Sequence, residues 1–143
     1  MQSWDKTFME MAKVIALRSK DRTKVGAVIV DARNRVTSVG FNGLPHTCDA
    51  FAERDILAGD DAGVDRLDAV VHAEQNAILF ARGDLVGQTL YCTHHPCVRC
   101  ASIICQSGIA RVVYGDGSLK SDHKTDAAKQ LFYHCGVRLE NGV

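Results

Sequence analysis

The sequence predicts an α/β fold in three layers, a mixed five-stranded sheet with helices on both faces. The first observation is that short runs rich in β-branched residues alternate with segments whose apolar residues recur at helical spacing. The second is that a tight turn joins the first two strands, whereas a helix precedes each later strand. Tight turns join antiparallel strands and helical crossovers join parallel ones, so the sheet should contain both kinds of pair.

The elements are expected in the order helix, strand, strand, helix, strand, helix, strand, helix, strand. In the first helix, Phe8, Met11, Ala12 and Ile15 form one apolar stripe. Helices are expected over residues 4–18, 70–81, 98–107 and 126–135. Strands are expected over residues 25–30, 36–41, 89–93, 109–114 and 137–139. The segment 46–67 lacks a clear pattern and is expected to be a loop with one short helix.

The bulk properties limit the possible partners. A length of 143 residues predicts one domain over residues 1–143. Lys plus Arg and Asp plus Glu both number 17, so no positive excess favours a long nucleic acid. No apolar run is long enough to span a membrane, and the charged N-terminal segment lacks a signal-peptide core. A soluble, cytoplasmic protein is therefore expected, and its six cysteines should be free or metal-bound thiols.

Two short motifs carry the candidate chemistry, His72-Ala73-Glu74 and the pair Cys97 and Cys100 after a proline. Two cysteines separated by two residues at the start of a helix can face one point, where the helix N-terminus favours thiolates. One imidazole and two thiolates form a three-ligand tetrahedral set with an open fourth position, which is typical of catalytic zinc. That position suits a water molecule whose pKa the metal lowers.

Glu74 is the candidate proton carrier. It lies two residues past His72, away from the ligand's direct face on a helix, so it need not bind the metal. It can accept a proton from water and deliver it to the ring nitrogen and the leaving amine. The combination of His-x-Glu with Pro-Cys-x-x-Cys is the signature of zinc deaminases. A closed structural zinc site or a redox pair is the alternative interpretation.

At these residues the chain resembles the deoxycytidylate deaminase family, within the wider cytidine deaminase fold. The resemblance extends over most of the chain, and Asn76 after His-Ala-Glu-Gln and the Phe-Asn-Gly stretch at 41–43 point to this branch. Its other segments are residues 24–30, 40–45, 72–79, 89–93 and 100–109. The resemblance implies a cytidine deaminase-like fold and hydrolytic deamination of dCMP to dUMP, with Zn²⁺ as the cofactor.

The resemblance also implies how the substrate is bound. Asn42 corresponds to the family's sugar-contacting asparagine, and the backbone N–H of Ala73 should donate to the pyrimidine carbonyl. A 5′-phosphate needs cationic or N–H partners, for which the candidates are Lys20, Arg22, Lys24 and Arg54. The family commonly forms homo-oligomers, often hexamers, and some members respond to dCTP and dTTP. A homo-oligomer, a hexamer or smaller, and these two effectors are therefore implied for this chain.

Three alternatives stay open. The first is a deaminase of another cytosine compound, such as dCTP, deoxycytidine or a modified cytosine. The second is a nucleic-acid editing deaminase, which the neutral charge balance disfavours. The third is a zinc-bearing module without catalysis, in which Glu74 would have little use.

The remaining His and Cys residues receive ordinary structural interpretations. His46 and Cys48 are too few to predict a second zinc site. His94 and His95 are expected to make local hydrogen bonds. Three further cysteines have apolar neighbours and are expected in the core: Cys92, Cys105 and Cys135.

Overall fold

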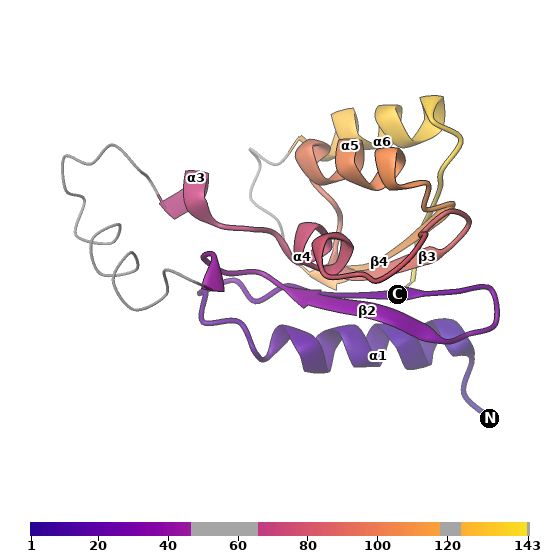
Figure 1. Ribbon diagram of the computed structural model, residues 1–143, viewed down its shortest axis with the longest axis horizontal. Coiled ribbons are helices and arrows are strands. Elements are labelled where there is room, and N and C mark those ends of the chain that lie inside the picture. Colours follow the sequence, from indigo (N-terminus) through magenta and orange to yellow (C-terminus); the bar gives the residue numbers. More distant parts are fainter. Residues whose placement is uncertain (47–65, 118–123, 143) are drawn as a thin grey trace.

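A computed structural model of the chain describes residues 1–46, 66–117 and 124–142 and contains the predicted mixed sheet (Figure 1). The strands are β1 (Gly26–Val30), β2 (Val36–Phe41), β3 (Thr89–His94), β4 (Arg111–Gly117) and β5 (Arg138–Asn141). Their order in the sheet is β2-β1-β3-β4-β5. β1 is antiparallel to both of its neighbours, whereas β3, β4 and β5 run parallel to one another. The predicted hairpin and the predicted parallel pairs are both confirmed.

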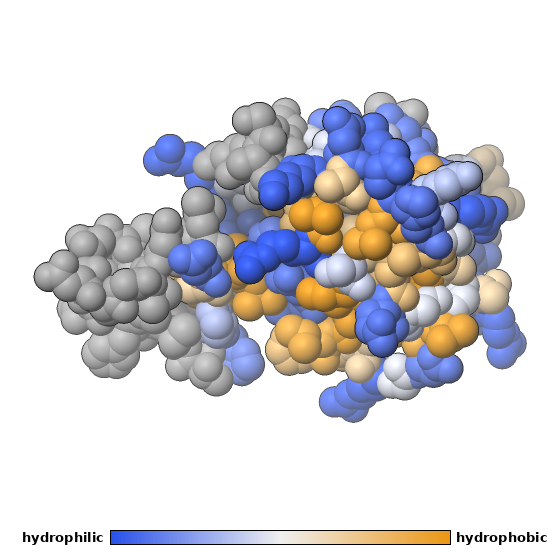
Figure 2. Space-filling model, turned by 90° about the horizontal axis from the view of Figure 1, so that it is seen from above, coloured by the Kyte–Doolittle hydropathy of each residue, from blue (hydrophilic) through white to orange (hydrophobic). Residues whose placement is uncertain are grey.

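Helices cover both faces of this sheet. They are α1 (Trp4–Ala16), α3 (Arg66–Ala69), α4 (Ala73–Leu79), α5 (Val98–Ser107) and α6 (Thr125–His134). α1 lies alone against one face, while α4, α5 and α6 lie on the opposite side (Figure 1). Seen from above Figure 1, the surface mixes hydrophobic and hydrophilic side chains (Figure 2). None of the described helices is long and apolar enough to cross a membrane.

The first core layer lies between α1 and the sheet. Phe8 and Ala12 pack there against Val28 and Tyr91. Gly26 makes this close contact possible, because a Cβ at residue 26 would lie 2.0 Å from the Ala12 carbonyl oxygen. Such a contact is sterically forbidden, so only glycine allows α1 to pack this closely at the start of β1.

The second core layer lies between the sheet and the helices on its other face. It includes Ile29, Leu90, Ile104, Val112 and Phe132, all of them almost fully buried. All five residues of β1 are buried, because helices cover β1 on both sides and another strand flanks it on each edge. This explains why β1 is a continuous apolar run in the sequence.

The main differences from the predicted boundaries concern α4 and the segment before it. The predicted helix over residues 70–81 begins only at Ala73, because His72 has the extended conformation of an N-cap residue, and it ends at Leu79. The predicted loop over 46–67 falls mostly on residues 47–65, which lie outside the described residues. The final strand is shifted, from the predicted 137–139 to Arg138–Asn141.

A charged network ties α1 to the edge of the sheet. Nη2 of Arg111 on β4 lies 2.6 Å from carboxylate oxygens of both Asp5 on α1 and Glu140 on β5. The Tyr91 hydroxyl donates a further hydrogen bond of 2.6 Å to Asp5. The hydrogen bonds from Arg111 hold the pKa of the Asp5 carboxyl below its usual value. Because that pKa is lowered on folding, Asp5 contributes stability that is present above its unfolded pKa.

We expect Asp5→Asn to reduce the free energy of unfolding by about 1 kcal/mol at neutral pH, since the pair is partly exposed. The contribution is lost as pH falls through the lowered pKa of Asp5, so the gap between wild type and variant should close below about pH 4. Urea unfolding at several pH values measures this. Glu10→Gln, on the same helix, is the control and should leave the pH dependence unchanged. A gap that persists undiminished into strong acid would contradict the assignment.

Candidate metal centre and active site

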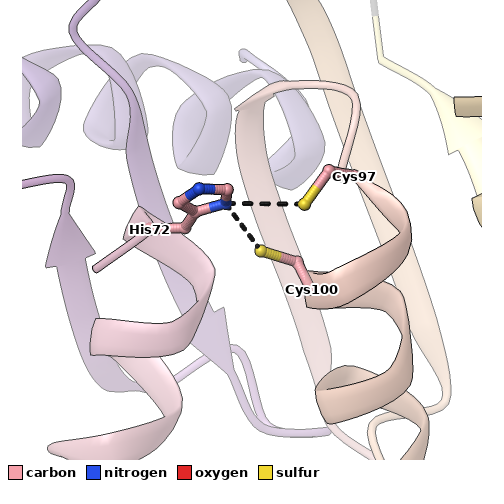
Figure 3. A group of neighbouring side chains, drawn as sticks. All are labelled: His72, Cys97 and Cys100. Atoms are coloured by element: carbon pink, nitrogen blue, oxygen red, sulfur yellow. Dashed lines mark hydrogen bonds between the residues drawn. The ribbon is translucent and has the colours of Figure 1, made fainter. Parts of the chain in front are cut away.

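His72, Cys97 and Cys100 converge on one point between two helix N-termini (Figure 3). His72 is the N-cap of α4, Cys97 is the N-cap of α5, and Cys100 lies in the first turn of α5. His72 Nδ1 lies 3.2 Å from Cys100 Sγ and 3.5 Å from Cys97 Sγ. All three candidate ligand atoms lie within 4.8 Å of one another, so one metal ion can contact them all.

The chemistry of this donor set fits zinc. An imidazole nitrogen and two sulfurs are ligands that zinc prefers, and within the described part of the chain no fourth His, Cys, Asp or Glu joins the group. A hydrogen bond from the Cys100 thiol, helped by His72, lowers the pKa of Cys97 to about 3. The same bond and burial raise the pKa of Cys100. The lowered pKa of Cys97 favours its thiolate, which is the form of cysteine that binds a metal.

Glu74 lies beside the metal-binding group without being one of its ligands. It is the second residue of α4 and is only 4% exposed. Burial raises the pKa of its carboxyl, which favours the protonated form. Its surroundings include His72, Cys97 and Cys100, each of which affects the pKa of this carboxyl. A buried carboxyl with a raised pKa is suited to carrying protons.

Two side chains of α4 hold the helix start in place. Gln75 Oε1 accepts a hydrogen bond of 2.9 Å from the His72 backbone N–H, which fixes the residue that carries the imidazole. Asn76 Nδ2 donates a bond of 2.8 Å to the carbonyl of Phe41, which ties α4 to the end of β2. Gln75 was not identified from the sequence. A glutamine three residues after an N-cap is half of a capping box, and that signal was available.

The packing of β2 against α4 is equally close. Ser38 Oγ donates a 2.6 Å hydrogen bond to the carbonyl of Ala77. A Cβ at residue 40 would lie 2.3 Å from the Ala73 carbonyl oxygen and 2.5 Å from the Ala77 backbone nitrogen. Gly40 is therefore required for α4 to reach its position, a requirement that no periodicity in the sequence reveals.

Asn42 lies at the end of β2 and is 8% exposed. Its Oδ1 accepts from the Val25 backbone N–H at 2.9 Å, and its Nδ2 donates to Thr23 O at 2.8 Å and to Asp21 Oδ2 at 3.1 Å. Both amide hydrogens are thus engaged, and one lone pair of Oδ1 is left for another donor. Asn42 therefore has a structural role that the sequence did not reveal, because it holds the segment before β1.

The candidate phosphate-binding cations have different positions. Arg22 and Lys24 are exposed and flank Thr23, which Asn42 holds, and Lys24 Nζ donates to the Ser19 carbonyl. Arg54 lies outside the described residues. Arg18, Lys20 and Asn42 also line a groove of about 610 Å³ between the end of α1, β2 and α4. His72, Cys97 and Cys100 do not line this groove, so it lies apart from the metal-binding group.

The remaining His and Cys predictions have mixed outcomes. His94 and His95 make local hydrogen bonds of 2.8 Å, to the Thr93 hydroxyl and the Pro96 carbonyl, as predicted. Cys92 is fully buried, as predicted. The core prediction is wrong for Cys135, which is exposed at the end of α6, and Cys105 is only partly buried. The helix pattern alone did not distinguish these surface thiols from core residues.

A mixed sheet that holds a His-Cys-Cys group able to bind a metal, beside a buried glutamate, is typical of an α/β metalloenzyme. Residues 2–116 match the family model of the cytidine and deoxycytidylate deaminase zinc-binding region, so the chain belongs to this family. An uncharacterised deaminase of Aliivibrio fischeri is 44% identical, over 97% of this chain and 93% of its own length. A probable deoxycytidylate deaminase of Drosophila melanogaster is 39% identical, over 98% of this chain and 72% of its own length.

A solved structure extends the comparison to the fold. It is the dCMP deaminase of the cyanophage S-TIM5 in complex with dCMP and dUMP. The TM-score between this chain and the phage enzyme is 0.72 at 28% sequence identity, and the match covers 99% of this chain and 98% of the phage chain. The cytidine deaminase-like fold expected from the sequence is thereby confirmed.

Gly40→Ala should push α4 away from β2, because the new methyl group would clash with backbone atoms of α4, which cannot rotate away as a flexible side chain can. We expect a loss of about 1–3 kcal/mol in the free energy of unfolding. We also expect a lower kcat for deamination. Gly43→Ala is the matched control, since a Cβ there meets no atom of the described residues within 4 Å, and it should change stability by less than about 0.5 kcal/mol. Chemical denaturation measures both variants, and equal effects would contradict the packing role of Gly40.

Proposed function

We propose that this protein is a zinc-dependent enzyme that hydrolyses dCMP to dUMP and ammonia. The observation that carries the proposal is the convergence of His72, Cys97 and Cys100, with Glu74 buried beside them. Zinc binding is supported by the donor set and by the zinc-binding region of the matching family model. The choice of dCMP is supported by relatives named as deoxycytidylate deaminases and by the phage enzyme solved with dCMP and dUMP.

The proposed mechanism assigns separate roles to the residues around the metal. His72, Cys97 and Cys100 would hold the zinc ion, whose chemistry there would be to lower the pKa of the water that attacks the ring. The Glu74 carboxylate would accept one proton from the attacking water and deliver it to the ring nitrogen, and would then accept the second proton from the hydroxyl group now on the ring carbon and deliver it to the departing amine. One water molecule is consumed and one ammonia released for each cytosine converted to uracil. The buried position of Glu74 suits this role. Burial raises the pKa of its carboxyl, so the carboxylate accepts a proton more readily than an exposed carboxylate does.

Substrate recognition is proposed for residues next to that centre. Ala73 is the first residue of α4, where a backbone N–H has no acceptor within the helix, and it would donate to the pyrimidine carbonyl. The free lone pair of Asn42 Oδ1 would accept from a sugar hydroxyl. Arg22, Lys24 and Arg54 would neutralise the 5′-phosphate.

Several further properties stay predictions. They are a single deaminase domain over residues 1–143, a homo-oligomer no larger than a hexamer, regulation by dCTP and dTTP, and a cytoplasmic location. The formal net charge of zero continues to favour a mononucleotide over a long nucleic acid as the substrate.

Glu74→Gln removes the proton carrier and keeps the volume of the side chain. We expect zinc content to stay at the wild-type level while kcat for dCMP falls by at least about 100-fold. Metal analysis and ammonia release measure the two quantities separately. Cys100→Ser is the contrasting variant and should lose the metal together with the activity. Full turnover by the glutamine variant would contradict the role of Glu74.

A panel of dCMP, CMP, dCTP and deoxycytidine tests the substrate. We expect kcat/KM to be highest for dCMP, because the cations near Asn42 recognise a 5′-phosphate. Arg22→Ala and Lys24→Ala should raise KM for dCMP and leave the rate on deoxycytidine unchanged. Comparable kcat/KM values for deoxycytidine and dCMP would overturn the mononucleotide assignment and favour a nucleoside deaminase.

A further inference from the structure

The start of α5 lacks the usual side-chain cap. Cys97 is the N-cap residue of α5 and makes no capping hydrogen bond through its side chain. Its sulfur instead belongs to the metal-binding group. Pro96, the residue before it, has no backbone N–H with which to anchor the turn. The position of Cys97 therefore depends on contacts made by other residues.

His95 makes such a contact. Its Nδ1 lies 2.8 Å from the carbonyl oxygen of Pro96. A carbonyl oxygen only accepts hydrogen bonds, so Nδ1 carries the hydrogen and is the donor. The peptide unit between Pro96 and Cys97 is planar, so a bond to its carbonyl also fixes the direction of the Cys97 nitrogen. The side chain of His95 thus holds the backbone from which a metal-binding sulfur projects.

The sheet holds the His95 ring in turn. The centroid of the imidazole lies 4.6 Å from the ring centroid of Tyr114, and the two ring planes are tilted by 56°. Tyr114 lies on β4, where it is paired in register with Cys92 of β3. Because β4 is an inner strand of the sheet, Tyr114 is a firm support for the imidazole. The His95 ring therefore links an inner strand to the peptide unit before Cys97.

The second nitrogen of the ring shows what histidine adds at this position. Nε2 is buried and has no hydrogen-bond partner among the described residues. A buried nitrogen without a partner costs free energy, a cost that the apolar ring of a phenylalanine would avoid. The hydrogen bond from Nδ1 to Pro96 is therefore the contribution that distinguishes histidine from an apolar residue here.

We propose that His95 is a positioning residue for the metal centre. It is not a member of the metal-binding group and acts through Cys97, because it holds the preceding carbonyl so that the Cys97 sulfur meets the same ion as His72 and Cys100. Groups that orient metal ligands in this way contribute to metal affinity. Zinc takes its sulfur ligands at about 2.3 Å in a tetrahedral arrangement, so a shifted peptide unit weakens binding. The role of His95 rests on the proposed zinc site and is independent of the substrate.

Two substitutions at His95 separate the hydrogen bond from the packing of the ring. His95→Phe keeps an aromatic ring against Tyr114 and removes the donor. His95→Asn removes the ring, but its amide nitrogen is bonded to Cγ, as Nδ1 is, and can donate to the Pro96 carbonyl. The zinc Kd is measured by competition with a chromophoric chelator. We expect it to rise about 10-fold or more in His95→Phe and to stay within about 3-fold of the wild-type value in His95→Asn.

His134→Phe, which replaces an exposed histidine on α6, is the matched control and should leave the zinc Kd unchanged. Urea unfolding of the metal-free proteins checks that each variant is folded. The absorption spectrum of the Co²⁺-loaded proteins reports the sulfur ligands and should change in His95→Phe alone. Wild-type zinc affinity in His95→Phe, or equally weakened binding in His95→Phe and His95→Asn, would overturn the role of His95. Failure of the wild-type protein to bind zinc would instead overturn the zinc site itself.

Discussion

The close packing of α4 on β2 determines where the metal-binding imidazole lies. Gly40 leaves room for the backbone of α4, and the side chains of Ser38 and Asn76 then bond the two elements together. His72 caps the helix that is held in this way, and Gln75 fixes its backbone. If α4 moved outward, the imidazole would leave the two sulfurs of α5. The geometry of the metal-binding group is therefore a property of the sheet and its covering helices.

The parallel half of the sheet supplies the other side of the centre. β3 ends just before Cys97, and α5 begins there, so the strand end and the helix N-terminus together bring both sulfurs to one point. The same strand–helix–strand arrangement is repeated with α6 and β5, so α6 lies beside α5 on the same face of the sheet.

The fold was predictable because its signals are local. The β-branched runs, the tight turn after β1 and the helical stripes each specify an element, and the connection lengths specify the strand directions. The metal-binding group was predictable because His-x-Glu and Pro-Cys-x-x-Cys are motifs that the sequence shows directly. The role of Gly40 depends on a contact between β2 and α4, so no spacing along the chain could reveal it. The exposure of Cys135 depends on how α6 packs, and the pattern of one helix does not specify that.

Metal dependence is the most direct test of an active site built on His72, Cys97 and Cys100. The measurement is the zinc content per chain together with the rate of ammonia release from dCMP, before chelation, after chelation and after zinc is added back. One zinc per chain, loss of both zinc and activity on chelation, and recovery of both with added zinc are expected. Full activity in protein shown to be free of metal would contradict the assignment.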